Sequence, residues 1–594
     1  MTDTARDLST VLLLSGNEAI ARGAWEAGVH LGSGYPGTPS SEILPALKDL
    51  GDAYVEWSVN EKVALEVAAG ASIAGARTLT TTKHVGLNVA ADPLFTLSYT
   101  GVEGGMVIAV ADDPSMHSSQ NEQDSRNYAR AAKVPMLQPA DSQEARDMTM
   151  RAYEISERFD TPVLVGVVTR ICHSDGIVEV APREDVELRG DLEKQPEKFV
   201  MVPGHARKAR VVMAERMKKL VAFAEETDLT REEMGGRSLG IIAGGTAYTY
   251  AREAFPEASF LKLGLVWPLP PERILAFAEK VDRLFVVEEL DPFLTEQISA
   301  LGVDVEEVDD RFRIGELLPG RVREMITGEA PPETDADADL PPRPPTLCAG
   351  CPHRSVFAAL RKLKAYVTGD IGCYTLGTLP PLEALHTCLC MGGGVSEAHG
   401  IQKVRGHEAP VVAVIGDSTF THTGVAGLIN IAYNAGVSTI VIMDNRTTAM
   451  TGGQVHPGVG VTLSGMPGRE LDFVKLAEAV GIEHVTVVDP YEVAETEQAL
   501  REAMDTAEPS VVITRHPCIL EVEERHPAPA LEIDACIHCA QCIRIGCPAL
   551  SNAAAEGDKP LPAIDTVLCT GCLMCAQVCP VDALQVPEDG EGDE

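Results

Sequence analysis

The C-terminal part of the sequence contains two runs of cysteines with the spacing of iron–sulfur ligands. Each run has three cysteines at three-residue intervals and a fourth that precedes a proline: Cys536, Cys539, Cys542 and Cys547, then Cys569, Cys572, Cys575 and Cys579. Three thiolates so close in sequence can surround one face of an iron–sulfur cube, whereas structural zinc favours paired Cys-x2-Cys units. The pattern predicts two [4Fe-4S] clusters. In such pairs each run gives its fourth cysteine to the other cluster, so we expect Cys579 to complete the first set and Cys547 the second.

A second group of chemically active residues follows two predicted buried strands at 411–415 and 440–443. Gly416-Asp417-Ser418 ends the first strand, and Asp444-Asn445 ends the second. Parallel α/β sheets bind ligands at these carboxyl ends. Gly416 allows close approach of a phosphate, and the Asp417 and Asn445 side chains with the Thr447 carbonyl offer hard oxygens suited to Mg²⁺. The alternative is a helix-capping Asp and a turn Asn.

This arrangement, with Thr451-Gly452-Gly453-Gln454 just beyond it, resembles the Mg²⁺–diphosphate site of thiamine diphosphate enzymes. A competing motif lies near the N-terminus, where Gly32-Ser33-Gly34-Tyr35-Pro36-Gly37 matches the dinucleotide-binding pattern G-x-G-x-x-G. Thr38-Pro39 would interrupt the helix that this pattern requires, so we do not expect NAD binding.

Composition excludes several classes of function. The net charge of −39 and pI near 4.7 argue against nucleic-acid binding, which needs basic faces. No apolar stretch is long enough to span a bilayer, and no export signal is recognisable. Fifteen cysteines with mostly ligand-type spacing then predict a reducing, cytoplasmic location, and oxygen-sensitive clusters would suit anaerobic metabolism.

Alternating strand and helix patterns predict a multidomain α/β protein with parallel, doubly wound sheets, because one core cannot organise a chain of 594 residues. A strand at 11–14 is expected to open the first sheet. We expect a first α/β domain at 1–170, a connector at 171–234, a smaller α/β domain at 235–330, a Pro/Asp linker at 331–346, a third domain at 347–525, a cluster domain at 532–585 and an acidic tail at 586–594.

The remaining strings give the chain a family resemblance. Tyr35-Pro36-Gly37-Thr38-Pro39-Ser40, with Glu61 and the Gly-rich helix at 68–75, resembles the pyrimidine-binding domain of 2-oxoacid:ferredoxin oxidoreductases. The chain as a whole resembles α subunits of the indolepyruvate ferredoxin oxidoreductases in that superfamily. The strings that match most closely are Gly16-Asn17-Glu18-Ala19, Ser118-Ser119-Gln120-Asn121-Glu122-Gln123-Asp124-Ser125-Arg126, Cys348-Ala349-Gly350-Cys351-Pro352-His353-Arg354 and Asp444-Asn445-Arg446-Thr447-Thr448-Ala449-Met450-Thr451-Gly452.

The resemblance implies two thiamine diphosphate domains, at 1–170 for the pyrimidine and 347–525 for the diphosphate. It also implies a small domain like the C-terminal domain of transketolase and a two-cluster ferredoxin-like domain. Glu61 would hold the aminopyrimidine N1′ atom, although a solvent-facing Glu in the first turn of a helix is the alternative. Thr38, Lys83 and His84 would face the substrate, with Lys83 as partner of its carboxylate, unless they are simply solvated.

Four further cysteines, Cys348, Cys351, Cys373 and Cys518, resemble in order and spacing the ligands of the cluster nearest thiamine in the wider superfamily. They predict a third cluster, which would take electrons singly from the cofactor. The alternative is that they are small buried core residues.

The implied reaction is oxidative decarboxylation of an aryl 2-oxoacid to an acyl-CoA, with electrons passed to ferredoxin. The implied partners are ferredoxin, coenzyme A and a smaller β subunit in an αβ or α2β2 assembly. The alternatives are an oxidoreductase for pyruvate or a branched-chain 2-oxoacid, a non-oxidative 2-oxoacid decarboxylase, and an electron-transfer subunit with a degenerate thiamine fold. The clusters argue against the decarboxylase, and Glu61, Asp417 and Asn445 argue against the degenerate fold.

Overall fold

The structure of the chain is a computed structural model that describes residues 10–190, 192, 194–330, 344–406, 409–555 and 557–585. The predicted acidic tail and most of the predicted linker, residues 331–343, lie outside the described residues. The chain divides into two compact units, Met1–Ala338 and Asp339–Glu594.

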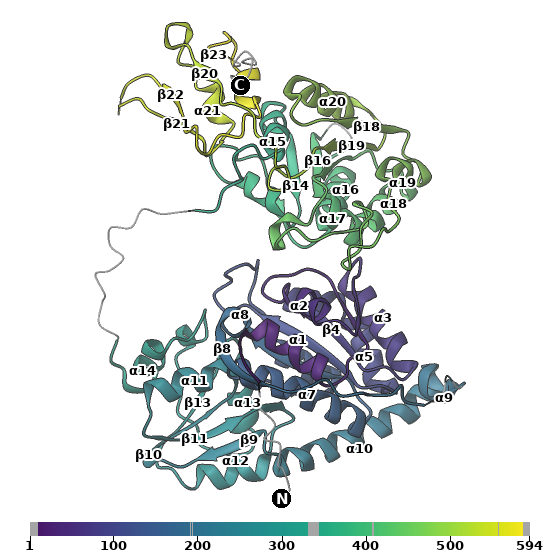
Figure 1. The fold of residues 1–594 in the computed structure, drawn as a ribbon, viewed down its shortest axis with the longest axis vertical. Coiled ribbons are helices and arrows are strands. Elements are labelled where there is room, and N and C mark those ends of the chain that lie inside the picture. Colours follow the sequence, from purple (N-terminus) through teal and green to yellow (C-terminus); the bar gives the residue numbers. More distant parts are fainter. Residues whose placement is uncertain are drawn as a thin grey trace, which may run out of the picture. The chain divides into compact units, whose positions relative to one another are not determined.

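Unit 1 is built around a seven-stranded sheet that carries helices on both faces (Figure 1). Six neighbouring strands are parallel, and the edge strand β12 pairs antiparallel with β6. In sheet order the strands are β12 (Leu265–Trp267), β6 (Met136–Leu137), β7 (Val163–Val168), β5 (Met106–Asp112), β4 (Thr78–Lys83), β2 (Leu31–Gly34) and β3 (Tyr54–Trp57).

The helices of this sheet form two layers, as the alternating pattern predicts. One layer comprises α3 (Glu61–Ile73), α4 (His84–Val89), α5 (Ala91–Thr100) and α6 (Ser125–Ala132), and the other comprises α1 (Gly16–Glu26), α2 (Ile43–Leu50) and α7 (Ser142–Phe159). No helix begins at the G-x-G-x-x-G glycines, because the chain turns through residues 35–42 before α2 starts. The geometry of a dinucleotide fold is therefore missing there.

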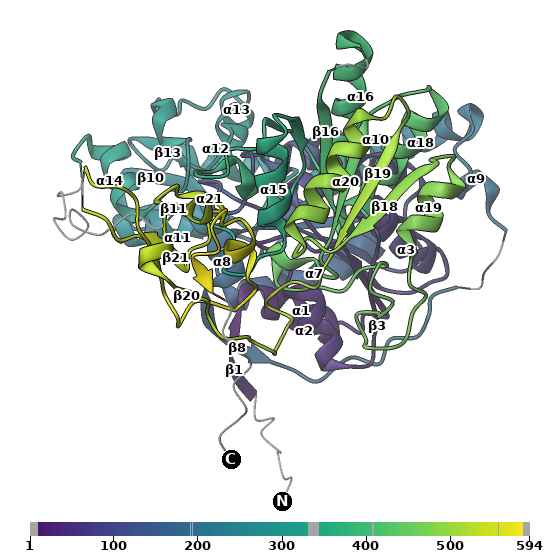
Figure 2. The same ribbon diagram turned by 90° about the horizontal axis from the view of Figure 1, so that it is seen from above.

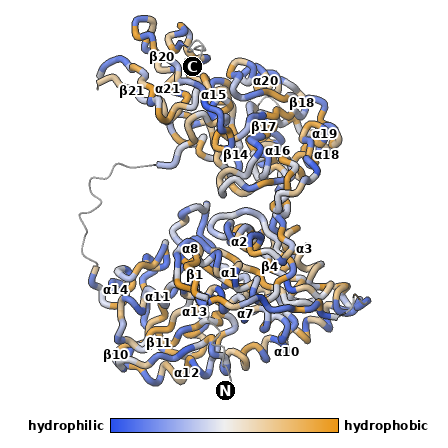
Figure 3. Tube along the Cα trace, viewed as in Figure 1, coloured by the Kyte–Doolittle hydropathy of each residue, from blue (hydrophilic) through white to orange (hydrophobic). Residues whose placement is uncertain are grey.

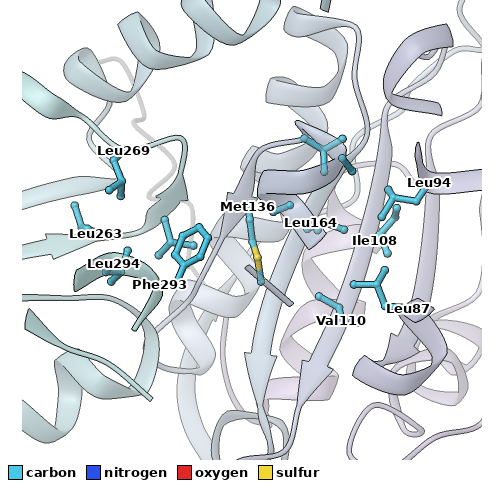
Figure 4. Packing of buried hydrophobic residues seen from close by; sticks show 14 of the residues in the cluster. Leu87, Leu94, Ile108, Val110, Met136, Leu164, Leu263, Leu269, Phe293 and Leu294 are labelled. Atoms are coloured by element: carbon cyan, nitrogen blue, oxygen red, sulfur yellow. The ribbon is translucent and has the colours of Figure 1, made fainter. Parts of the chain in front are cut away.

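A smaller four-stranded sheet completes unit 1. Its order is β13 (Leu284–Val287), β10 (Gly236–Ala243), β11 (Ala258–Leu263) and β9 (Thr230–Glu233), with β9 antiparallel. Helices α11 (Gly245–Ala254) and α14 (Pro319–Thr327) cover one face, while α12 (Pro271–Ala278) and α13 (Phe293–Ser299) cover the other. The second face shares one hydrophobic core with the larger sheet, in which Phe293 and Leu294 join Met136 and Leu164 (Figure 4).

The expected strand at 11–14 forms, but its predicted place in the parallel sheet is wrong. Strand β1 (Thr10–Ser15) pairs only with β8 (Asp175–Val180), antiparallel, in a separate two-stranded sheet. The connector continues through α8 (Thr169–His173), α9 (Pro196–Phe199) and the long helix α10 (Pro203–Glu226). Hydrophobic and hydrophilic segments alternate along α10 (Figure 3), which matches its buried Met213, Leu220 and Phe223 among charged neighbours.

Unit 2 contains a fully parallel six-stranded sheet. The strand order is β15 (Thr387–Cys388), β14 (Tyr366–Gly369), β16 (Val411–Gly416), β17 (Thr439–Asp444), β19 (Ser510–Arg515) and β18 (His484–Val488). Alternate residues of β16 point to opposite faces of this sheet, and each face packs against its own hydrophobic core. One core holds α15 (His353–Lys362) and α20 (Val493–Asp505), and the other holds α16 (Gly393–Arg405), α18 (Val425–Tyr433) and α19 (Phe473–Ala479).

The cysteine-rich segment follows this sheet and belongs to the same unit. It contains two short antiparallel pairs and two single-turn helices: β20 (Ala530–Leu531) with β23 (Leu584–Gln585), β21 (Leu550–Asn552) with β22 (Pro562–Ile564), α21 (Gln541–Arg544) and α22 (Met574–Gln577). The segment lies beside α15 in both views (Figures 1 and 2), and α22 contacts α20. The expected fold class, with two doubly wound domains, a smaller α/β domain and a C-terminal cluster domain, is confirmed.

Candidate functional site

The residues predicted to hold a metal–diphosphate group meet at the carboxyl ends of β16 and β17 in unit 2. Asp417 is 2% exposed, and one carboxylate oxygen accepts a hydrogen bond of 2.7 Å from the Ser418 amide. The other oxygen accepts a bond of 2.8 Å from the Arg446 amide, in the loop after β17. The Thr448 hydroxyl lies 2.9 Å from that of Ser418, so the two loops are joined at two points. Asn445 and Thr447 are buried in the second loop.

Two buried carboxylates in this site favour a bound cation. Burial raises the pKa of Asp444, and the neighbouring Asp417 carboxylate raises it further, while Arg515 opposes both effects. One Asp444 oxygen pairs with Arg515 at 2.7 Å, but the other has no hydrogen-bond partner among the residues that the structure describes. A buried carboxylate oxygen without a partner is costly. Oxygen donors of this kind suit Mg²⁺, so the residues present fit a metal and the diphosphate that it would bind.

Two histidines lie near Asp417. Sequence patterns alone did not identify either of them as a site residue. His456 places Nε2 3.2 Å from an Asp417 oxygen, and it follows the Thr-Gly-Gly-Gln string by two residues. Burial lowers the pKa of His353 to about 4, against the attraction of the Asp417 carboxylate. His353 is thus neutral at pH 7, and it follows the Cys348–Cys351 loop directly in the chain. The sequence feature that could have identified His353 is its position in the string Cys351-Pro352-His353-Arg354.

The four cysteines predicted to hold a third cluster come together beside this site. Burial raises the pKa of Cys373 to about 11, and the nearby thiols of Cys518 and Cys348 raise it as well. Burial likewise raises the pKa of Cys351 to about 12, with Cys373 and Cys348 adding to the effect. The Cys518 amide donates a hydrogen bond of 2.9 Å to the carbonyl of Asn445. Cys348 is exposed and is therefore not a core residue, whereas Cys373 is half-buried and packs against the hydrophobic core.

The two cysteine sets of the C-terminal segment line separate cavities. Cys536, Cys539, Cys542 and Cys579 line the first, together with apolar residues such as Leu531 and Val581. Cys547, Cys569, Cys572 and Cys575 line the second, which also reaches Gly350 in the loop before α15. Each cavity is therefore lined by three cysteines of one run and by the fourth cysteine of the other run. Among the described residues, no group of three or more His, Cys, Asp or Glu side chains lies close enough together to hold a single metal ion.

Unit 1 holds the predicted pyrimidine-binding carboxylate in a buried position. Glu61 begins α3 and is 5% exposed, so the alternative of a solvent-facing side chain does not hold. Asn60 caps the helix by accepting a hydrogen bond of 2.9 Å from the Val63 amide. A Cβ at Gly86 would lie 2.5 Å from a Glu61 carboxylate oxygen, so the Glu61 side chain packs closely against Gly86. Glu66, by contrast, is exposed and pairs with Lys62.

Thr38, Lys83 and His84 surround one segment that follows β5. The Ser118 hydroxyl donates to the Thr38 carbonyl at 3.3 Å, and the Lys83 ammonium donates to the Ser118 carbonyl at 2.7 Å. His84 Nε2 lies 3.2 Å from the Asn121 carbonyl. Burial lowers the pKa of Lys83 to about 8, although the Asp113 carboxylate opposes this shift. These three side chains are buried or half-buried, which a merely solvated loop would not require.

Known protein families match three parts of the chain: the larger sheet of unit 1, the sheet of unit 2 and the cysteine-rich segment. A family model described as pyruvate flavodoxin/ferredoxin oxidoreductase, thiamine diP-bdg, matches residues 22–232. The C-terminal thiamine pyrophosphate-binding domain model matches residues 370–514, and a 4Fe-4S binding domain model matches residues 562–585. Indolepyruvate oxidoreductase subunit IorA of Archaeoglobus fulgidus is 39% identical over 98% of this chain and 99% of its own. The chain belongs to the IorA family.

Membership of the IorA family rests on relatives that match from end to end. The IorA protein of Methanothermobacter thermautotrophicus is 40% identical over 98% of both chains. A solved 2-oxoglutarate:ferredoxin oxidoreductase from Magnetococcus marinus aligns with 54% of this chain and 66% of its own, at 16% identity and a TM-score of 0.44. As an IorA protein the chain is an oxidoreductase subunit that uses thiamine diphosphate and [4Fe-4S] clusters. No helix in the described part of the chain is long and apolar enough to cross a membrane.

Proposed function

We propose that this IorA protein catalyses the oxidative decarboxylation of an aryl 2-oxoacid of the indolepyruvate type. The products are carbon dioxide and an aryl acyl-CoA, and two electrons leave singly for ferredoxin. The relatives are named for indolepyruvate, and this name is the basis for the aryl substrate. The observation that carries the proposal is the meeting, in unit 2, of the Asp417 site with the Cys348, Cys351, Cys373 and Cys518 thiols.

Thiamine diphosphate and Mg²⁺ would be held through named groups of this chain. Asp417, Asn445 and the Thr447 carbonyl would bind Mg²⁺, and the Gly416 and Ser418 backbone would lie along the diphosphate. When bound, thiamine diphosphate supplies the electron sink that decarboxylation of a 2-oxoacid requires. Glu61 would hold a proton at N1′ of the aminopyrimidine, and its buried position keeps water from competing for that hydrogen bond.

The residues around Ser118 in unit 1 would bind and orient the substrate. The Lys83 ammonium would pair with the substrate carboxylate, and Thr38 and His84 would border the keto group. A buried ammonium attracts an anion more strongly than an exposed one, because the medium around it has a lower effective dielectric constant. Burial of Lys83 supports this role.

We propose three [4Fe-4S] clusters in this chain. Cys348, Cys351, Cys373 and Cys518 would hold the first, beside the Asp417 site. Cys547, Cys569, Cys572 and Cys575 would hold the second, and Cys536, Cys539, Cys542 and Cys579 the third. The two four-cysteine cavities of the C-terminal segment support the crosswise sets.

A smaller β subunit would bind coenzyme A and complete the substrate site, in an αβ or α2β2 assembly. The relatives are named as subunits, which supports a partner chain. Ferredoxin would be the external electron acceptor.

The test is dye reduction by the complex of this chain with its β subunit, purified without oxygen. Viologen reduction should require both indolepyruvate and coenzyme A, and it should be slower with pyruvate or a branched-chain 2-oxoacid. The Asp417→Asn variant should lose bound thiamine diphosphate and reduce no dye. Carbon dioxide release without dye reduction would instead identify a non-oxidative decarboxylase.

A further inference from the structure

Arg354 is a buried cation with no acidic partner. Its side chain is 1% exposed, which makes it the largest fully buried side chain of the chain's described part. In the residues that the structure describes, no carboxylate forms an ion pair with it. Its three nitrogens donate only to backbone carbonyls. A buried charge of this kind is costly unless an opposite charge lies nearby.

The carbonyls that Arg354 binds belong to two different cysteine loops. Nε donates to the Cys348 carbonyl at 3.0 Å, and one terminal nitrogen donates to that of Leu347. The other terminal nitrogen donates to the Gly546 carbonyl and lies 3.4 Å from that of Ile545. The guanidinium therefore ties the loop that leads into Cys348 to the loop that ends at Cys547.

The acidic groups that act on Arg354 are cysteines. Burial lowers the pKa of Arg354, and Cys351, Cys547, Cys348 and Cys572 oppose this shift. These four residues belong to two of the cysteine sets, one beside Asp417 and one in the C-terminal segment. A thiolate-ligated iron–sulfur cluster is a negatively charged group, so one at either set would supply the missing counter-charge.

Other contacts hold the same two cysteine sets together. The Tyr491 hydroxyl donates to the Gly350 carbonyl at 2.6 Å, and Gln577 donates to the Tyr491 carbonyl at 2.7 Å. Gly350 also lines the cavity of Cys547, Cys569, Cys572 and Cys575. The other cavity of the segment, around Cys536, is lined only by residues 531–584. The Cys547 set is therefore the inner one of the segment, and the Cys536 set is the outer one.

We propose that Arg354 is a positioning residue for electron transfer, which fixes the Cys348 and Cys547 sets in one arrangement and raises the reduction potentials of the clusters they hold. The inference rests on the proposed third cluster. A fixed positive charge stabilises the reduced form of a nearby cluster, since reduction adds a negative charge. Electrons would thus pass from the Asp417 site through the Cys348 set and the Cys547 set to the outer set.

The test is a redox titration, followed by electron paramagnetic resonance, of the complex of this chain with its β subunit. Arg354→Gln removes the charge. It should lower the equilibrium constant for reduction of the inner clusters at least tenfold, or about 59 mV for one electron, and leave the outer cluster unchanged. The matched control is Arg361→Gln on the same helix, because Arg361 is exposed and solvent screens its charge. It should shift no potential.

A second variant separates charge from geometry. Arg354→Lys keeps the charge but cannot reach carbonyls of both loops, so the potentials should hold while reduction of the outer cluster slows. If Arg354→Gln fails to assemble iron, the lysine variant decides: an unchanged rate would overturn the inference. Unshifted potentials in an iron-replete Arg354→Gln protein would also overturn it. About eight irons per wild-type chain instead of about twelve would reject the third cluster of the proposed function, a distinct result.

Discussion

Burial distinguishes Glu61, the carboxylate predicted to hold the thiamine aminopyrimidine, from Glu66 on the same helix. Glu61 is 5% exposed and lies against Gly86, while Glu66 is exposed and pairs with Lys62. We predict that Glu61→Gln lowers the rate of dye reduction by about 10²–10⁴-fold, the usual range for loss of an acid–base group. Bound thiamine diphosphate should be partly retained, because Asp417 and its neighbours remain intact.

Glu66→Gln is the matched control for this experiment, since it makes the same change five residues further along α3. Its activity should stay near that of the wild type, because an exposed ion pair contributes little. Thiamine content and activity are measured on the same preparations. A fully active Glu61→Gln protein, or an inactive Glu66→Gln protein, would show that the assignment is wrong.

Site residues could be predicted where the functional side chains lie within one short stretch of sequence. Asp417 and Asn445 each end a buried strand, so strand context and residue type were sufficient to select them. His353 and His456 were missed as site residues because only tertiary packing brings them to Asp417. His353 begins α15 and His456 lies in a loop, and the sequence neighbours of neither residue specify its proximity to Asp417.

At the scale of elements, sequence patterns predicted where strands form, but they did not always predict which strands pair. The sequence of β1 is an apolar run typical of a buried strand, yet Val11 is 53% exposed and Leu13 is 67% exposed. Its partner β8 lies more than a hundred residues away, and no local signal specifies antiparallel pairing over that distance. The same holds for β12, which leaves the segment predicted as the small domain and joins the edge of the larger sheet.

One element-scale prediction concerns the Cys348–Cys351 loop. Gly350 has φ of 72°, and a Cβ there would lie 2.2 Å from the Thr570 hydroxyl oxygen in the cluster segment. Gly350→Ala should therefore force the loop and the cluster segment apart. We expect a loss of about 2–3 kcal/mol in the free energy of unfolding, from left-handed backbone strain plus overpacking. Thermal unfolding of the iron-loaded protein measures it.

Gly557→Ala provides the control, because Gly557 has φ of 91° in the same segment and no atom of the described residues lies within 4 Å of an added Cβ. It should show only the backbone cost of about 1 kcal/mol. Adding Thr570→Ala to Gly350→Ala should restore part of the loss. Equal losses for Gly350→Ala and Gly557→Ala would mean that contact between the loop and the segment does not stabilise unit 2.

At the scale of the whole molecule, the described residues divide among a few recognisable parts. They form two large parallel sheets with their helices, a smaller sheet and a cluster segment, and the family models match the first, third and last of these along the chain. The relatives are named as subunits, and the proposed handling of coenzyme A by a second chain can be tested directly.

We predict that this chain alone assembles its clusters but gives no coenzyme A-dependent dye reduction. Adding the β subunit should restore turnover, and the rate should saturate when the two chains are equimolar, because each substrate site needs one of each. The measurement is a titration of β subunit into iron-replete α subunit, with viologen reduction as the readout and an unrelated acidic protein as the control. Robust turnover of the chain by itself would refute the need for a partner. Saturation at half an equivalent would indicate that one β subunit serves two of these chains.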